Sequence, residues 1–144
     1  MTTINTYLAF NGNCEEAFLF YKSVFGGEYS HIAKFDEMPE DPKCPISEED
    51  KDKVMHVSLP ISKETVLMGS DTGGEWSDGF KQGNNFSISI AAKSKDDADR
   101  FFNKLSQGGQ VVMPMDKTFW GSYFGMFTDK FGIQWMVSFD EGHM

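Results

Sequence analysis

One pattern occurs twice along the chain, and this repeat limits the folds that the chain can adopt. Each half has an alternating apolar segment, a helical segment, a Gly-Gly pair and three further strand-like segments. The first half spans residues 1–72 and the second spans 84–144, separated by a linker at 73–83 that is rich in Gly. A β-α-β-β-β unit has one uncovered sheet face, so two paired units would enclose a cleft. The sequence therefore predicts an α+β protein, in which the two units form one domain with a curled mixed sheet around a cleft.

In the first half, the helix has the clearest signals. A strand at 4–10 precedes Asn13, which is expected to cap a helix that ends at Phe25, with Glu16 in the capping-box position. Apolar residues recur at helical spacing, and the glycine pair then ends the helix. The three further strands are expected at 29–35, 54–61 and 65–70.

Residues 36–52 interrupt this pattern. They contain three prolines and eight acidic residues against two lysines. Such a composition is typical of a solvated, mobile surface loop. A lid that closes over a binding cleft is the alternative interpretation.

The second half repeats the order of the first. A strand at 85–91 precedes a helix with Ser94 and Asp97 in a capping box. In the last turn, Gly132 can adopt positive φ, and Asp129 can hydrogen-bond the backbone of its own turn. The remaining strands are expected at 110–115, 120–128 and 133–139.

Charge and cysteine content exclude several classes of function. The net charge of -9 argues against binding to nucleic acid or to an anionic membrane surface, because both are polyanions. No apolar run is long enough to span a membrane, and the N-terminus lacks the pattern of a signal peptide. Cys14 and Cys44 have neither metal-type nor oxidoreductase-type spacing, so a cytoplasmic location is expected. Either cysteine could be a reactive thiol or a bystander.

Three segments carry a resemblance to a known family: 7–13, 67–71 and 119–137. They resemble the PhnB-like branch of the glyoxalase/bleomycin resistance/dioxygenase (vicinal oxygen chelate) superfamily, whose members often carry the label 3-demethylubiquinone-9 3-methyltransferase. The resemblance implies the paired-unit fold and a homodimer. Methyltransferase activity is not expected, because the chain has no Gly-x-Gly-x-x-Gly turn for a nucleotide cofactor.

The resemblance also allows a test for a metal. Metal-dependent members of the superfamily hold a divalent ion with His, Gln or Glu side chains, and the matching positions here are Thr6, Met68, Ser87 and Met136. None of these four is a usual ligand for Zn²⁺, Ni²⁺, Mn²⁺ or Fe²⁺. The sequence therefore predicts no metal, no cofactor, and neither glyoxalase-type nor dioxygenase chemistry.

Two classes of function remain, with a filled cleft as a third possibility. The first is a metal-free protein that binds a small, largely apolar or aromatic molecule. Its expected ligand-binding residues are the apolar Met68, Trp120, Phe124, Trp135 and Met136 and the polar Thr6, His56, Ser87 and Gln134. The second is a cofactor-independent enzyme in which His56, together with Tyr123, transfers a proton on a small molecule.

Overall fold

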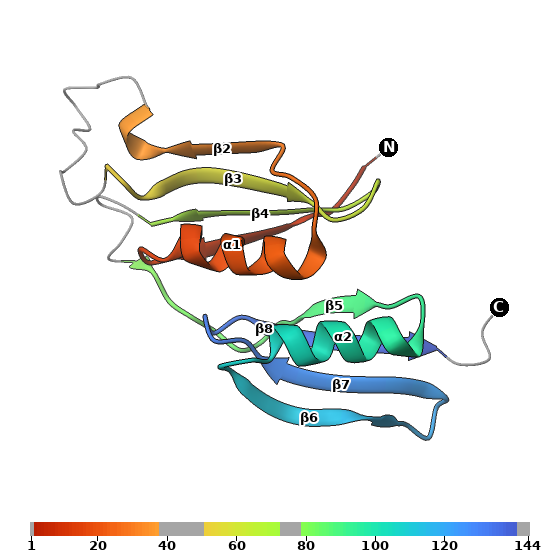
Figure 1. The fold of residues 1–144 in the computed structure, drawn as a ribbon. Helices are drawn as coiled ribbons and strands as arrows, with labels where there is room; N and C mark the ends of the chain where they lie inside the picture. The colour runs from red at the N-terminus through yellow and green to blue at the C-terminus, as the bar shows by residue number, and fades with distance from the viewer. Residues whose placement is uncertain (1, 38–50, 73–78, 141–144) are drawn as a thin grey trace. The chain divides into compact units, whose positions relative to one another are not determined.

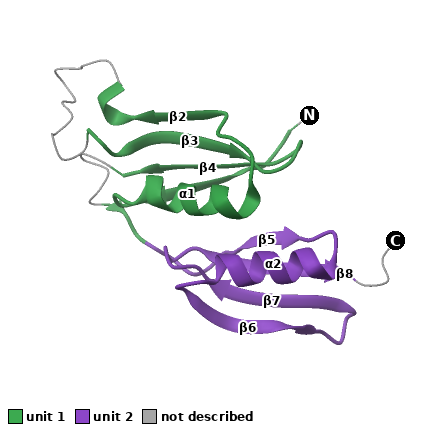
Figure 2. Cartoon of the chain, in the orientation of Figure 1, with its two compact units in different colours: residues 1–81 green, residues 82–144 purple. Residues whose placement is uncertain are grey.

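The structure, a computed structural model, describes residues 2–37, 51–72 and 79–140 (Figure 1). The chain divides into two compact units, residues 1–81 and 82–144 (Figure 2). This boundary falls inside the predicted linker at 73–83. Most of that linker and most of the acidic loop at 36–52 lie outside the described residues. The lid that was considered for this loop therefore also lies outside them.

In the part of unit 1 that the structure describes, an α-helix and a short 3₁₀ helix accompany a mixed four-stranded sheet. Its sheet order is β1-β4-β3-β2, with β1 and β4 parallel and the other neighbours antiparallel (Figure 1). All of the strands expected in this half are present, although several are shorter than predicted. The elements are β1 (Thr6–Phe10), α1 (Cys14–Phe25), β2 (His31–Lys34), the short 3₁₀ helix η1 (Phe35–Glu37), β3 (Val54–Pro60) and β4 (Val66–Asp71).

Helix α1 covers one face of this sheet at very short range. Its apolar stripe, which includes Ala17, Phe18 and Tyr21, is fully buried. The helix can approach β4 because that strand has Gly69 at the contact. A Cβ atom there would lie 2.6 Å from a ring carbon of Phe18 and 2.9 Å from the backbone oxygen of Leu8. This contact shows which face of the sheet is turned to the helix. The residues directly before and after Gly69 in β4 therefore lie on the opposite face.

The N-terminus of α1 is capped from another strand. Asn13 occupies the N-cap position, but its side chain makes no capping hydrogen bond, so the predicted capping box with Glu16 is wrong. Instead, Oδ1 of the buried Asp71 accepts hydrogen bonds from the backbone N–H groups of Gly12 and Cys14, both at 2.9 Å. Its Oδ2 accepts another from Val54 N at 2.9 Å. A carboxylate held by the tertiary fold takes the place of the local cap.

Unit 2 repeats this topology, with the sheet order β5-β8-β7-β6 and β5 parallel to β8 (Figure 1). Here the predicted cap is confirmed, since Ser94 Oγ accepts a hydrogen bond from Asp97 N at 3.0 Å. No helix within the described ranges is long and apolar enough to cross a membrane. The elements are β5 (Ile88–Ala91), α2 (Lys95–Leu105), β6 (Gln110–Lys117), β7 (Ser122–Thr128) and β8 (Gln134–Asp140).

The turn between β7 and β8 is built around a buried carboxylate, as predicted. Gly132 has φ of +90°, and Asp129 Oδ1 accepts from the backbone N–H groups of Phe131 and Ile133 at 2.9 and 3.0 Å. Asp129 Oδ2 accepts from the indole N–H of Trp135 at 2.8 Å. The turn is therefore fastened to the core of unit 2 as well as to its own backbone.

Candidate functional site

The two faces of the unit 2 sheet have different roles. Gly125 faces the helix, because a Cβ atom there would lie 2.8 Å from the ring of Phe102 on α2. Phe124 is the adjacent residue in the strand and lies on the opposite face. We call this the open face of unit 2. A ligand of unit 2 that contacts Phe124 would lie on this face.

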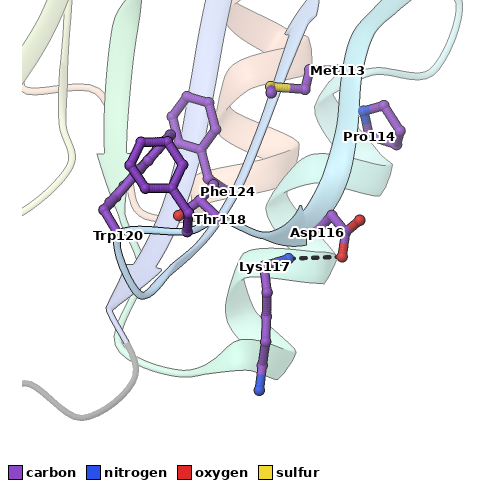
Figure 3. A pocket seen from close by; sticks show the side chains of 8 residues that line it. Met113, Pro114, Asp116, Lys117, Thr118, Trp120 and Phe124 are labelled. Atoms are coloured by element: carbon purple, nitrogen blue, oxygen red, sulfur yellow. Dashed lines mark hydrogen bonds between the residues drawn. The ribbon is translucent and has the colours of Figure 1, made fainter.

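A pocket of about 430 Å³ lies beside the β6–β7 connection. Trp120 is 57% exposed and its ring packs edge-to-face on Phe124, with ring centroids 6.1 Å apart. Phe119 packs against Trp120 in the same way, at 4.9 Å. Figure 3 shows Trp120 and Phe124 on one side of the pocket and Met113 and Pro114 of β6 on the other. The full lining is Met113, Pro114, Asp116, Lys117, Thr118, Phe119, Trp120 and Phe124.

The polar residues that line the pocket form hydrogen bonds with backbone atoms of their own loop. Asp116 Oδ1 accepts a hydrogen bond from Lys117 N at 2.8 Å. The Thr118 hydroxyl donates to the carbonyl oxygen of Ser122 at 2.8 Å. The side chain of Lys117 extends away from the aromatic rings (Figure 3). The surface that the pocket offers to a ligand is therefore mainly aromatic and aliphatic.

The other predicted residues of unit 2 do not line this pocket. Trp135 is only 2% exposed, and its indole N–H is bonded to Asp129, so this side chain belongs to the core and not to a ligand surface. Met136 lies opposite Met126 in the β7–β8 register, on the open face. Gln134 Nε2 donates to the carbonyl oxygen of Gly83 at 3.2 Å. Ser87 directly precedes β5.

Tyr123 lies on the helix side of β7. Its hydroxyl donates to Asp99 Oδ1 at 2.5 Å, and the ammonium of Lys95 lies 4.9 Å from its ring centroid. Both partners come from α2. The phenol is thus engaged by α2, and its part in proton transfer together with His56 stays a prediction.

In unit 1, His56 has hydrogen-bond partners that the sequence reasoning missed. Its Nδ1 lies 3.1 Å from the hydroxyl of Tyr7, and its Nε2 lies 2.9 Å from the hydroxyl of Ser58. The ring of His56 also stacks on that of Tyr7, with centroids 5.6 Å apart, and lies at a tilt of 43° to that of His31, with centroids 5.4 Å apart. We call these four residues the Tyr–His cluster.

The strand register explains why Tyr7 was missed. Met68 lies between Tyr7 on β1 and Ser58 on β3, so these three side chains share the face away from α1. Thr6 pairs with Leu67 and lies on the helix side. The prediction counted one residue too early on β1 and chose Thr6. The available signal was the spacing of the large apolar residues Leu8 and Phe10, which places Tyr7 on the opposite face of the strand.

These positions do not fit a divalent metal. The register brings Tyr7 beside Met68 in unit 1 and Ser89 beside Met136 in unit 2. A phenol, a hydroxyl and two thioethers are poor donors for Zn²⁺ or Mn²⁺, which prefer imidazole, carboxylate or thiolate. Across the described ranges, no three His, Cys, Asp or Glu side chains are grouped so that they could hold an ion.

Cys14 does not have the surroundings of a reactive thiol. Its side chain is fully buried at the start of α1. Burial, and secondly the nearby Asp71 and Glu15 carboxylates, raises the pKa of the Cys14 thiol far above its usual range. The thiol is therefore held protonated, which makes it a poor nucleophile.

Known proteins resemble the chain over nearly its whole length. The sequence pattern of the family described as 3-demethylubiquinone-9 3-methyltransferase matches residues 2–138. Protein YjdN of Escherichia coli K12 is 28% identical, with 94% of this chain and 93% of that protein aligned.

The solved structures agree with this match. Protein PA1353 of Pseudomonas aeruginosa is 39% identical with a TM-score of 0.82, covering 97% of this chain and 98% of that one. A Bacillus cereus PhnB protein, described as a putative 3-demethylubiquinone-9 3-methyltransferase, is 26% identical with a TM-score of 0.71, over 96% and 99% of the two chains. A glyoxylase/bleomycin resistance protein/dioxygenase domain from Frankia is 12% identical with a TM-score of 0.63, over 99% and 93%, and shares the fold.

Proposed function

The chain belongs to the 3-demethylubiquinone-9 3-methyltransferase family and has the glyoxalase/bleomycin resistance fold, and from this premise we propose that it binds a small, largely apolar or aromatic molecule without a metal. The observation that supports the proposal best is the pocket beside Trp120 and Phe124. The family description names a methyltransferase, but the described units are both β-α-β-β-β and neither is a doubly wound nucleotide-binding sheet.

The exposure of the aromatic rings favours a ligand over simple packing. Phe119 is 98% exposed and Trp120 is 57% exposed, although both are large apolar side chains. A planar molecule inserted against them would bury apolar surface at roughly 25 cal/mol per Å². About 150 Å² of newly buried apolar surface would then contribute roughly 4 kcal/mol before the cost of association. Binding in the micromolar range needs further contacts of the same kind, which Met113 and Pro114 can supply.

Titration with N-phenyl-1-naphthylamine, an uncharged aromatic probe that fluoresces in apolar surroundings, tests this proposal. We expect saturable binding, and a loss of roughly tenfold or more in affinity for Phe124→Ala, because one ring of the pocket is removed. Phe86→Ala is the matched control, since Phe86 is a 62% exposed phenylalanine of the same unit outside the pocket lining. Equal binding by the wild type and both variants would reject the pocket.

A second candidate function rests on a different observation, the hydrogen-bonded chain of Tyr7, His56 and Ser58. An imidazole between two hydroxyls can accept a proton at one nitrogen and release one at the other. The alternative proposal is therefore a cofactor-independent enzyme that uses His56 for proton transfer on a small molecule. His56→Ala separates the two candidates: ligand affinity alone should change if the protein only binds its ligand, whereas turnover should vanish if the protein is an enzyme.

We also propose that the protein is a homodimer, as the family resemblance implies, and that it is located in the cytoplasm, as its cysteine content predicts. Light scattering on the purified protein should then give twice the chain mass of 16.3 kDa. A mass of one chain at micromolar concentration would contradict the dimer without affecting the pocket.

A further inference from the structure

The connection between β6 and β7 is a turn with unusual residues. It consists of residues 118–121, and the N–H of Gly121 donates to the carbonyl oxygen of Thr118 at 3.2 Å, which closes a β-turn. The central positions of such turns commonly carry Gly, Pro, Asn, Asp or Ser. Here they carry Phe119 and Trp120, two large apolar residues that are exposed. Turn chemistry does not explain these two rings, and such departures are expected at functional sites. We call residues 118–121 the aromatic turn.

The two rings of the aromatic turn stand at right angles to each other. The interplanar angle between Phe119 and Trp120 is 89°. Trp120 is also tilted by 64° against Phe124 of β7. A flat aromatic molecule that stacks on one ring of a perpendicular pair lies at right angles to the other ring, so it can use both favourable geometries of aromatic contact. A saturated molecule of the same size gains only from the apolar area that it buries.

The side chain of Thr118 fastens the base of the aromatic turn. Its hydroxyl donates to the carbonyl oxygen of Ser122 at 2.8 Å and accepts from the backbone N–H of the same residue at 3.2 Å. The backbone N–H of Thr118 also donates to that carbonyl oxygen, at 2.8 Å. Ser122 is the first residue of β7 and is buried. The hydroxyl of Thr118 therefore ties both rings of the turn to the rigid part of unit 2.

Gly121 gives the turn its backbone conformation. Its φ of +92° is a value that residues with a Cβ atom rarely adopt. No atom of the described residues lies within 4 Å of a Cβ atom at this position, and Gly121 does not line the pocket. A substitution here therefore changes the conformation of the turn without removing a contact to a ligand.

We propose that Thr118 is a positioning residue, whose hydroxyl holds Phe119 and Trp120 at right angles and so makes the pocket selective for flat aromatic molecules over saturated ones. This inference rests on the function proposed above for the same pocket. A ligand that meets rings already in place does not bear the entropic cost of ordering them. Without the hydroxyl, the rings become ordered only when the ligand binds, so both affinity and selectivity fall.

Substitutions of Thr118 distinguish positioning from direct contact, because the two roles predict opposite signs. Thr118→Val replaces a hydroxyl by a methyl group in a mainly apolar lining, so a role in contact alone would leave the affinity for N-phenyl-1-naphthylamine unchanged or raise it. We expect a loss of about tenfold instead. Thr118→Ser keeps the hydroxyl and should restore the affinity to within about twofold of the wild type. Circular dichroism checks that both variants are folded.

Gly121→Ala tests the turn by a second route. It strains the backbone of the aromatic turn and should weaken binding of the same probe by about fivefold. Gly26→Ala is the matched control, because Gly26 in unit 1 also has positive φ, at +79°, and no described atom lies within 4 Å of its Cβ position. The control should bind the probe like the wild type.

Displacement of the probe by 1-naphthol and by its saturated analogue decahydro-1-naphthol measures selectivity. The wild type should bind the flat molecule about tenfold more tightly, because ring contacts add to the buried area. Thr118→Val should bind the two molecules about equally.

Three results would each overturn the proposal. Probe affinity in folded Thr118→Val as high as in the wild type would show that the hydroxyl does not position the rings. Equally weak binding by Thr118→Val and Thr118→Ser would show that loss of the hydroxyl is not the cause. Equal affinity of the wild type for the two naphthols would show that the perpendicular rings do not select flat molecules. In each case, weaker probe binding by Phe124→Ala would still support the pocket, so the proposed function can stand when this inference fails.

Discussion

At the scale of single residues, Asp129 is a buried carboxylate in unit 2 that accepts hydrogen bonds from several donors. It is 3% exposed, and its two oxygens accept from two backbone N–H groups and one indole N–H. In Asp129→Asn, the amide can still accept at one atom, but its NH₂ group would face the N–H of Trp135. We expect a loss of about 3 kcal/mol in the free energy of unfolding, because a buried donor is left unsatisfied and a charged hydrogen bond is lost.

Chemical denaturation of a double-mutant cycle checks this expectation. Trp135→Phe removes the indole N–H, so it should cost less in the Asp129→Asn background than in the wild type. The control Asp116→Asn changes an exposed carboxylate that accepts one local bond and should shift stability by less than about 0.5 kcal/mol. Strictly additive effects of the two core changes would show that the indole bond contributes nothing.

Sequence reasoning at this scale succeeded where partners are local. Asp129 and Ser94 bond to backbone groups within a few residues, so spacing along the chain was enough to predict both. The cap of α1 comes from Asp71, which is 59 residues from Gly12 and 57 from Cys14, and Tyr7 is 49 residues from His56. Such partners depend on which strands pair and in which register, and composition and periodicity along the chain do not specify them.

At the scale of elements, the spacing between helix and sheet depends on small residues in the strand beneath the helix. Gly69→Ala places a methyl group 2.6 Å from Phe18 and 2.9 Å from the backbone oxygen of Leu8. The backbone atom cannot move aside without shifting β1, so we expect a loss of about 2 kcal/mol or more in the free energy of unfolding. Thermal unfolding followed by circular dichroism measures it.

Gly79→Ala is the matched control for this substitution, because none of the residues that the structure describes lies within 4 Å of a Cβ atom at that position. It should leave the melting temperature within about one degree of the wild type, or raise it slightly. If Gly69→Ala melted like Gly79→Ala, the close approach of α1 to the sheet would be incorrect. Helix periodicity predicted both helices, but this glycine contact could be recognised only after the sheet register was known.

At the scale of the whole molecule, the repeat was the most informative sequence feature. It predicted two units of the same element order, and both sheets have that order. The site was less predictable. Trp120 and Phe124, two of the residues expected to bind a ligand, line one pocket, and the ligand itself stays a prediction. Trp135, which was expected beside them, is buried in the core of unit 2, because the sequence alone does not show which face of its strand carries the helix.

The absence of a metal is a prediction for the whole molecule as well. We expect elemental analysis of the purified protein to find no stoichiometric Ni, Zn, Mn or Fe, since the register offers Tyr7, Met68, Ser89 and Met136 in place of strong ligands. An ion at a thousand times its Kd would stabilise the native state by about 4 kcal/mol and raise the melting temperature by several degrees. After EDTA treatment, melts in each of the four ions should therefore coincide with the melt in buffer alone. A shift of that size would contradict the prediction, and its persistence in His56→Gln would locate the ion away from the Tyr–His cluster.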